Sequence, residues 1–180
     1  MKYIALLRGI NIGRENRIKM ADLRTIFESM GFKNVKTYLQ SGNVIFDNKF
    51  IDNVKIAEDI ERKVSRTFGF AVNAVIRTDN EFENIINNNP FINDSNIGLD
   101  KLHVTFLKEA FDKETILDLN LNKEENEKFE IKGSEIYLYL PNGYARTKLT
   151  NNTFERKLKI IATTRNWKTV NKLLELSKLE

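Results

Sequence analysis

Apolar and polar residues follow one another along the chain in patterns that predict strands alternating with helices. The run Lys2 to Arg8 is apolar on both alternating faces, which is typical of a central strand covered on both sides. Apolar residues at helical spacing then predict one helix over Lys19 to Met30 and another with a stripe from Ile56 to Phe68. Asp52 and Gly69 are suited to begin and end the second helix.

Between these helices, the segment from Lys36 to Asp47 predicts a β-hairpin whose two-residue tip is Ser41 and Gly42. This tip would pair Gln40 with Asn43, Leu39 with Val44, Tyr38 with Ile45, Thr37 with Phe46 and Lys36 with Asp47. The pairing sorts the apolar residues onto consistent faces and closes the open end with an opposite-charge pair.

A further strand over Val72 to Arg77 completes the order β-α-β-β-α-β, which is the ferredoxin-like or split βαβ arrangement. Thr78 and Glu81 have the spacing of a capping box and predict the start of a short helix.

The same order of elements recurs in the second part of the chain. The expected elements are strands at 102–108, 128–132, 135–140 and 163–165, helices at 113–119 and 153–161, and a last helix with Asn166 as its N-cap. Gly133 and Ser134 predict a second hairpin tip that pairs Ile131 with Ile136 and Phe129 with Leu138. We therefore expect an α+β protein of two ferredoxin-like halves in tandem, related by internal duplication. The expected bounds are 1–78, a connector helix and loop over 79–98, and 99–180 with an extra C-terminal helix.

Charge is distributed unevenly, although the formal net charge is only +4. Between Gly143 and Lys172 there are eight Lys or Arg residues against the single acid Glu155, whereas acids outnumber bases eleven to six between Asp94 and Glu135. This asymmetry favours an anionic partner for the C-terminal segment, and a solvated helix face is the competing interpretation.

Several classes of function lose support from composition. The chain has no cysteine, which excludes disulfides, thiolate catalysis and cysteine-based metal sites and fits a cytoplasmic protein. His103 is the one imidazole and lies among apolar strand residues, where a structural role is the more common one. No segment has the ~18 apolar residues of a membrane span, so no membrane partner is expected. No cofactor or metal is expected either.

The candidate ligand site follows from the predicted topology. The first two strands of a split βαβ unit run parallel, so the loop after the first strand and the tip of the hairpin emerge at the same edge of the sheet. This edge would gather Arg8, Gly9, Asn11, Gly13, Arg14, Arg17, Lys19, Gln40, Ser41, Gly42 and Asn43. Glycines that expose backbone N–H groups, nearby cations and a helix N-terminus suit an anion, and an ordinary loop beside a tight turn is the alternative.

A second candidate cluster lies in the basic segment. Arg146, Lys148 and Arg165 are positioned in the sequence to meet phosphate oxygens, and Trp167 to stack on a base. A single Trp at the start of an amphipathic helix is more often a core residue.

Six blocks of the sequence resemble a known family, the bacterial proteins grouped as domain of unknown function 1697. The blocks are Leu7–Gly13, Lys19–Met20, Thr37–Val44, Asn89–Phe91, Gly143–Leu149 and Thr164–Val170. The resemblance implies a cytosolic α+β protein of two related subdomains, and it implies no activity. Two of its blocks are the loop and the hairpin tip of the candidate edge.

The leading hypothesis from the sequence is a non-enzymatic protein that binds an anionic ligand, either nucleic acid or a nucleotide. The alternative is an enzyme acting on a small phosphorylated or carboxylated substrate between the halves. Arg8, Arg77 or Arg146 would then clamp the anion, with Ser41, Tyr38 or Lys148 handling protons. A third possibility is a protein whose edge strands recruit a partner chain. The sequence leaves the oligomeric state open.

Overall fold

The computed structural model describes residues 1–49, 52–110 and 121–179. The chain forms two compact units, one comprising Met1–Glu83 with Lys172–Glu180 and the other Asn84–Asn171. In the described residues, no helix combines the length and the apolar character that crossing a membrane requires.

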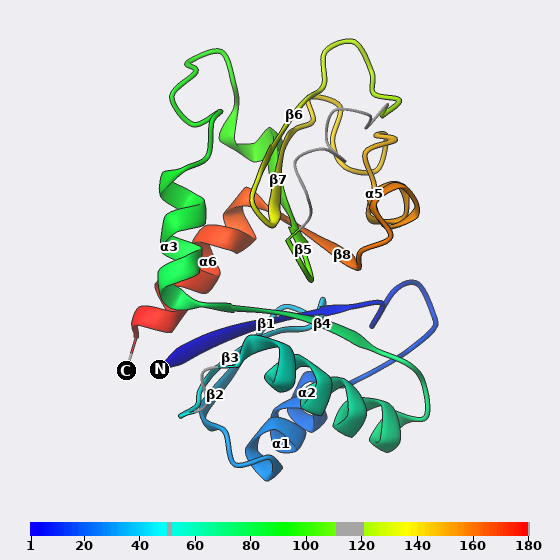
Figure 1. Cartoon of the computed structure of the whole chain (residues 1–180), viewed down its shortest axis with the longest axis vertical. Helices are drawn as coiled ribbons and strands as arrows, with labels where there is room; N and C mark the ends of the chain where they lie inside the picture. The colour runs from blue at the N-terminus through cyan, green and yellow to red at the C-terminus, as the bar shows by residue number, and fades with distance from the viewer. Residues whose placement is uncertain (50–51, 111–120, 180) are drawn as a thin grey trace. The chain divides into compact units, whose positions relative to one another are not determined.

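The first unit contains a four-stranded antiparallel sheet with helices on one of its faces (Figure 1). Its strands are β1 (Lys2–Arg8), β2 (Lys33–Tyr38), β3 (Asn43–Asp47) and β4 (Asn73–Thr78), and its helices are α1 (Met20–Ser29) and α2 (Asn53–Phe68). The spatial order β2-β3-β1-β4 is that of the ferredoxin-like fold and confirms the predicted split βαβ arrangement.

The core of this unit lies between the sheet and the two helices. Alternate residues of β1 and β3, such as Tyr3 and Phe46, point into it, and their rings stack at a centroid distance of 5.7 Å. Helix α2 begins where predicted, because the Asp52 carboxylate accepts the N–H groups of Val54 and Lys55. It ends at Gly69, whose φ of 80° is the left-handed conformation expected of a C-cap.

The register predicted for the first hairpin is wrong by two residues. Tyr38 pairs with Asn43 and Thr37 with Val44, so the strands are joined by the four-residue turn 39–42 rather than by Ser41 and Gly42 alone. A shift of two keeps each side chain on its predicted face, since faces alternate with a period of two. Leu39 is the exception, because it leaves the strand and is 53% exposed.

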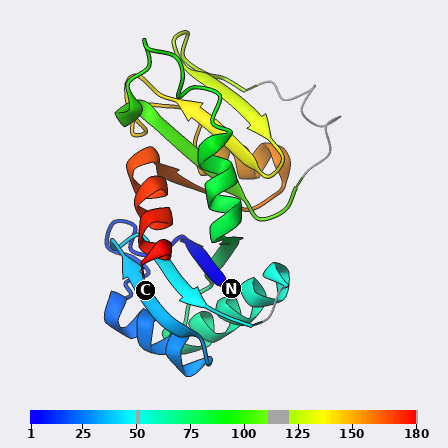
Figure 2. The same cartoon turned by 90° about the vertical axis from the view of Figure 1, so that its left-hand side faces the viewer.

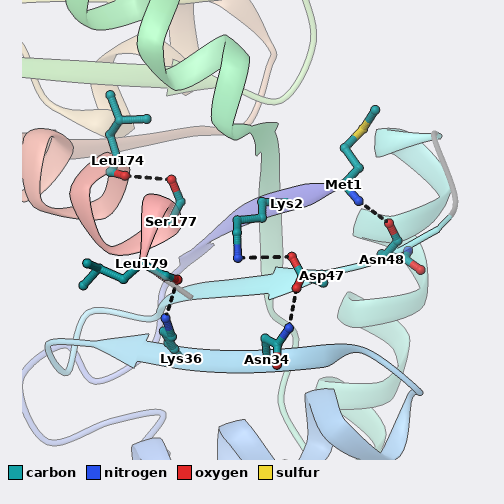
Figure 3. Close-up of polar contacts among 9 residues, drawn as sticks. All are labelled: Met1, Lys2, Asn34, Lys36, Asp47, Asn48, Leu174, Ser177 and Leu179. Atoms are coloured by element: carbon teal, nitrogen blue, oxygen red, sulfur yellow. Dashed lines mark hydrogen bonds and ion pairs between the residues drawn. The ribbon is translucent and has the colours of Figure 1, made fainter.

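The open end of the hairpin also differs from the prediction, as Figure 3 shows. Asp47 forms an ion pair with Lys2 at 3.6 Å and accepts a hydrogen bond from the side chain of Asn34. The two-residue shift places Lys36 opposite Ile45, and its side chain donates to the carbonyl of Leu179 at 2.8 Å. A bulge between Lys33 and Lys36 then places Lys33 opposite Asp47. The predicted pair of Lys36 with Asp47 is therefore not formed.

The second unit repeats the strand order of the first. Its strands are β5 (Leu102–Leu107), β6 (Lys128–Lys132), β7 (Glu135–Tyr139) and β8 (Ala162–Asn166), arranged β6-β7-β5-β8 and all antiparallel. The hairpin of β6 and β7, yellow in Figure 2, pairs Ile131 with Ile136 and Phe129 with Leu138, as predicted. Helix α5 (Asn151–Leu158) begins and ends earlier than expected. The helix predicted at 113–119 lies outside the described residues.

Two further helices follow the last strand of each sheet directly, and both begin as the sequence predicts. At the start of α3 (Asp79–Asn87) the Glu81 carboxylate accepts from the N–H and hydroxyl groups of Thr78, whose hydroxyl oxygen accepts from the N–H of Glu81. At the start of α6 (Trp167–Lys178) the Asn166 side chain accepts from the N–H of Thr169 at 2.8 Å. A short 3₁₀ helix, Leu99–Lys101, precedes β5.

Candidate functional site

The loop after β1 and the turn after β2 lie against each other, which confirms the adjacency predicted from topology. The Leu7 N–H donates to the carbonyl of Gly42 at 2.8 Å, and the Asn11 side-chain amide donates to the carbonyl of Gln40 at 2.8 Å. Residues 9–19 and 39–43 are called the Gly9 edge below. It combines two segments that belong to different blocks of the sequence.

Asn11 organises the loop side of the Gly9 edge. Its amide donates to the carbonyls of Ile18 and Gln40, and its oxygen accepts the N–H of Ile18 at 2.9 Å. Asn11 has a φ of 53°, a left-handed conformation that Asn tolerates better than most residues. Ile10 and Ile18 are buried in the core on either side, so the intervening residues are held outward. Asn11 is therefore a structural clamp of the loop.

Gly42 and Asn43 shape the turn side of the edge. Gly42 has a φ of 76°, and a Cβ at this position would lie 2.7 Å from Ile10 Cδ1 and 2.8 Å from Leu7 Cβ. The buried Asn43 side chain donates to the carbonyl of Tyr38 and to the hydroxyl of Ser41. These two residues allow the turn to close against β1, while Gln40 and Ser41 remain exposed.

Three cations of the loop face solvent. Arg14, Arg17 and Lys19 are exposed, and within residues 1–49, 52–110 and 121–179 their side chains make no hydrogen bond or ion pair. Lys19 is also the N-cap of α1 and provides no side-chain cap for it. Glu15 is the one acid between Gly9 and Lys19. The loop thus presents positive charge beside an uncapped helix start, where anions are favoured.

The other predicted loop residues have different environments. Arg8 is only partly exposed and has interactions within the protein. Gly9 and Gly13 have φ values of 85° and 58°, which suit glycine and shape the loop. Ile12 and Leu39 are 60% and 53% exposed. Ile12 follows Asn11 in the chain and Leu39 precedes Gln40, and the side chain of Asn11 donates to the carbonyl of Gln40. The edge therefore carries an apolar component next to its cations.

The second predicted cluster is divided within the second unit. Arg146 and Lys148 are exposed, and Lys148 forms an ion pair with Glu124 at 3.6 Å. Arg165 is 9% exposed, and its guanidinium donates to the Thr163 hydroxyl at 2.8 Å and the Thr164 carbonyl at 3.0 Å. Trp167 is 7% exposed and belongs to the core. Arg165 and Trp167 therefore do not form an open phosphate and base site.

His103 occupies a structural position. Its ring stacks on Tyr144 at a centroid distance of 5.5 Å, and its Nδ1 lies 3.3 Å from the carbonyl of Lys101. Burial lowers the pKa of His103, and the Lys101 carbonyl opposes this effect. The imidazole is therefore neutral over most of the physiological pH range.

A groove of about 950 Å³ in the first unit lies away from the Gly9 edge. It is lined by Met1, Lys2, Met30, Gly31, Phe32, Lys33, Asp47, Asn48, Lys49, Asp52, Lys55, Ile56, Asp59 and Asp79. Its charges are mixed, Asp47 is paired with Lys2, and Asp52 caps α2. None of the predicted site residues lines this groove.

Comparison with known proteins agrees with this architecture. A family model described as "Protein of unknown function (DUF1697)" matches residues 1–137. The chain belongs to this family. The structure of conserved bacterial protein SP0830 from Streptococcus pneumoniae matches with a TM-score of 0.72 and 23% sequence identity, over 98% of each chain. This DUF1697 chain thus shares its fold with SP0830, and no curated protein matches it.

Sequence reasoning did not assign Thr150, Thr153, Arg156 and Lys157, which line one pocket of about 350 Å³ together with Lys148. The spacing of these residues along a basic helix could have indicated that they lie together, because residues three to four apart share a helix face. Only the fold shows that this face borders a pocket.

Proposed function

We propose that this DUF1697 protein binds nucleic acid or a nucleotide at the Gly9 edge, without catalysing a reaction on it. The observation that supports this most directly is the group of three exposed cations, Arg14, Arg17 and Lys19, which have no ion-pair partner among the described residues. Unneutralised cations on one short loop favour an anion of matching spacing.

Phosphate is the anion that suits these groups best. The guanidinium groups of Arg14 and Arg17 each provide a planar fork of donors, which matches two oxygens of a phosphate. The first turn of α1 has no side-chain cap at Lys19, so its N–H groups favour negative charge nearby. Successive phosphates of a single strand, or the phosphates of one nucleotide, would use the same groups.

The exposed apolar residues of the edge support a ligand that also has bases. Ile12 and Leu39 flank the joined loop and turn, and neither is buried by the protein itself. A base of a single strand is unstacked and offers an apolar face that such side chains contact. A purely inorganic anion would leave both residues in water.

The two halves also support the proposal of an internal duplication. The register places Arg77 opposite Ile4 and Arg165 opposite Val104. Both arginines are nearly buried, both donate to the carbonyl of the preceding residue, and both immediately precede the residue that caps the next helix. A shared ancestral half would account for this correspondence.

Anisotropy of a labelled single-stranded oligonucleotide tests the proposed site. Replacing Arg14, Arg17 and Lys19 together by Gln should weaken binding at least about tenfold, with a shallower dependence of log K on log salt. The matched control replaces Arg62, Lys63 and Arg66 of α2, which are exposed, carry the same three charges and lie on a helix remote in sequence. This control should change affinity less than about twofold.

The result that contradicts the proposal is an equal loss of affinity in both triple variants, or no loss in either. A parallel melting experiment with a nucleotide panel separates the two ligand classes. A saturable rise in melting temperature with one nucleotide and no oligonucleotide binding would assign a nucleotide rather than a strand.

A further inference from the structure

The second unit contains a small pocket whose ionisable lining residues, among those that the structure describes, are all basic. Its volume is about 350 Å³, and its lining residues are Leu121, Asn122, Lys148, Thr150, Thr153, Arg156 and Lys157. No acid is among these described lining residues. The pocket shares no residue with the Gly9 edge.

Two of the three cations are unneutralised. Arg156 and Lys157 are exposed and make no side-chain hydrogen bond or ion pair in the part of the chain that the structure describes. Lys148 pairs with Glu124 at 3.6 Å, but both side chains are at least half exposed, so this pair is weak and exchangeable. The described lining residues therefore retain a net positive charge.

Hydrogen bonds and a ring contact hold the backbone next to this pocket. Tyr144 stacks on His103, and its hydroxyl accepts the N–H of Asn151 at 3.1 Å. The Thr153 hydroxyl donates to the Lys148 carbonyl at 2.7 Å, and the Thr150 hydroxyl oxygen accepts the N–H of Thr153. These bonds hold the backbone that leads from Lys148 into α5.

The cations provide the recognition, because two of the amides at the start of α5 already have acceptors within the protein. The N–H groups of Asn151 and Thr153 donate to Tyr144 and Thr150 and are not available to a ligand. Thr153 and Lys157 are four residues apart and share one face of α5, and Thr150 is the N-cap of this helix. Arg156 borders the same face, and Lys148 approaches from the preceding turn.

We propose that this pocket binds the terminal phosphate of a small phosphorylated molecule. A terminal phosphate carries close to two negative charges and three acceptor oxygens, which matches Arg156, Lys157 and a Lys148 released from Glu124. The volume is near the lower limit of small-molecule pockets, so it accommodates a phosphate group and a short part of its carrier rather than a whole nucleotide. The site is independent of the function proposed for the Gly9 edge.

Titration of the ¹⁵N-labelled protein with inorganic phosphate and with pyrophosphate tests this proposal, with ionic strength held constant by sodium chloride. Saturable shifts are expected at the amides of Thr150, Thr153 and Lys157. Arg156→Gln and Lys157→Gln should each weaken binding about three- to fivefold. The matched controls Arg66→Gln on α2 and Lys168→Gln on α6, both exposed, should leave the affinity unchanged.

A gain of affinity provides a second readout that does not depend on losing a residue of the pocket. Glu124→Gln removes the competitor of Lys148 and should tighten pyrophosphate binding about twofold. The spectrum of each variant reports directly whether the fold is retained. Unchanged or weakened binding in Glu124→Gln, where the fold is retained, would overturn the role assigned to Lys148 and with it the three-cation site.

Binding of two trinucleotides, one with a 5′-phosphate and one with a 5′-hydroxyl, distinguishes a terminal phosphate from the phosphodiester backbone as the bound group. The proposal expects only the phosphorylated trinucleotide to depend on Arg156 and Lys157. Equal dependence of both would show that the pocket reads the phosphodiester backbone, and the proposal would be wrong. Shifts that do not saturate, or equal losses in the Arg66 and Lys168 controls, would likewise overturn it.

Discussion

The side-chain amide of Asn11 lies 2.8 Å from the backbone carbonyl of Gln40, across 29 positions of sequence. This hydrogen bond joins the loop after β1 to the turn after β2 and makes them one surface. The backbone bond from Leu7 to Gly42 supports the same junction from within the sheet. The proposed ligand edge depends on it, because the cations of the loop are positioned only when the loop is held.

Replacing Asn11 by Ala is expected to lower the free energy of unfolding by about 2 kcal/mol, because three hydrogen bonds are lost and Ala is strained at positive φ. Asn11→Gly removes the same bonds without the strain, so it should cost about 1 kcal/mol less. Urea denaturation measures both values. Equal stability of Asn11→Ala and wild type would show that the clamp contributes nothing.

Gly42→Ala should destabilise the protein by about 2–4 kcal/mol. The new Cβ would lie within 3 Å of Leu7 and Ile10, and the left-handed backbone adds its own strain. Gly133→Ala is the matched control, since Gly133 has a φ of 60° but a Cβ added there would have no atom within 4 Å, and it should cost about 1 kcal/mol. Thermal or urea unfolding of the two variants measures the difference. Similar losses of stability in the two variants would contradict the close contact of Gly42 with Leu7 and Ile10.

The stability contributed by His103 should depend on pH in one direction. Burial holds its folded-state pKa below the unfolded value of ~6.5, so the unfolded chain binds a proton that the folded chain does not. This contribution is fully present above ~6.5 and decreases as pH falls through the folded-state pKa. His103→Phe keeps an aromatic ring against Tyr144, and it should lose less stability than wild type between pH 7.5 and 5.

Proton NMR measures the folded-state pKa of His103 without ambiguity, because the chain has one histidine. A midpoint above that of a histidine in an unfolded peptide would contradict the predicted direction. An identical pH dependence of unfolding in wild type and His103→Phe would contradict the predicted linkage.

Thr78→Val is expected to destabilise the protein by about 1 kcal/mol by removing the two hydroxyl hydrogen bonds of the capping box at the start of α3. Val keeps the shape of the side chain but cannot accept the N–H of Glu81 or donate to its carboxylate. Thr67→Val on α2 is the control, because the exposed Thr67 hydroxyl donates only to the Lys63 carbonyl of its own helix. This substitution should change the free energy of unfolding by less than about 0.5 kcal/mol. Equilibrium unfolding and amide exchange in α3 distinguish the two.

The two hairpins show where local rules are sufficient. A Cβ added at Gly133 would have no atom of the described residues within 4 Å, and the pairing of β6 with β7 follows the local turn rule residue by residue. Gly42 lies close to Leu7 and Ile10, and the turn that contains it has four residues, 39–42, instead of the two predicted. The register of the first hairpin was therefore predicted incorrectly, although the faces of its strands were not.

The basic segment shows a second limit of sequence reasoning. Arg165 and Lys148 belong to the same excess of positive charge, but strand alternation turns the Arg165 side chain into a nearly buried position where Thr163 and Thr164 accept its hydrogen bonds. Lys148 lies on an exposed turn beside α5. An excess of basic residues in a sequence indicates a segment that could bind an anion, whereas burial in the fold decides which of its cations remain available to a ligand.

Among the described residues, the sequence by itself determined the main helices and strands, their order, the caps of α2, α3 and α6, and the parallel direction of β1 and β2 that brings the loop and the turn to one edge. These features depend on residues close to one another in the chain and on their periodicity. Tertiary structure decided the length of the first turn, the clamp of Asn11 on Gln40 and the exposure of each cation. Such features depend on which distant atoms meet and on what they exclude from water, and a local pattern does not contain that information.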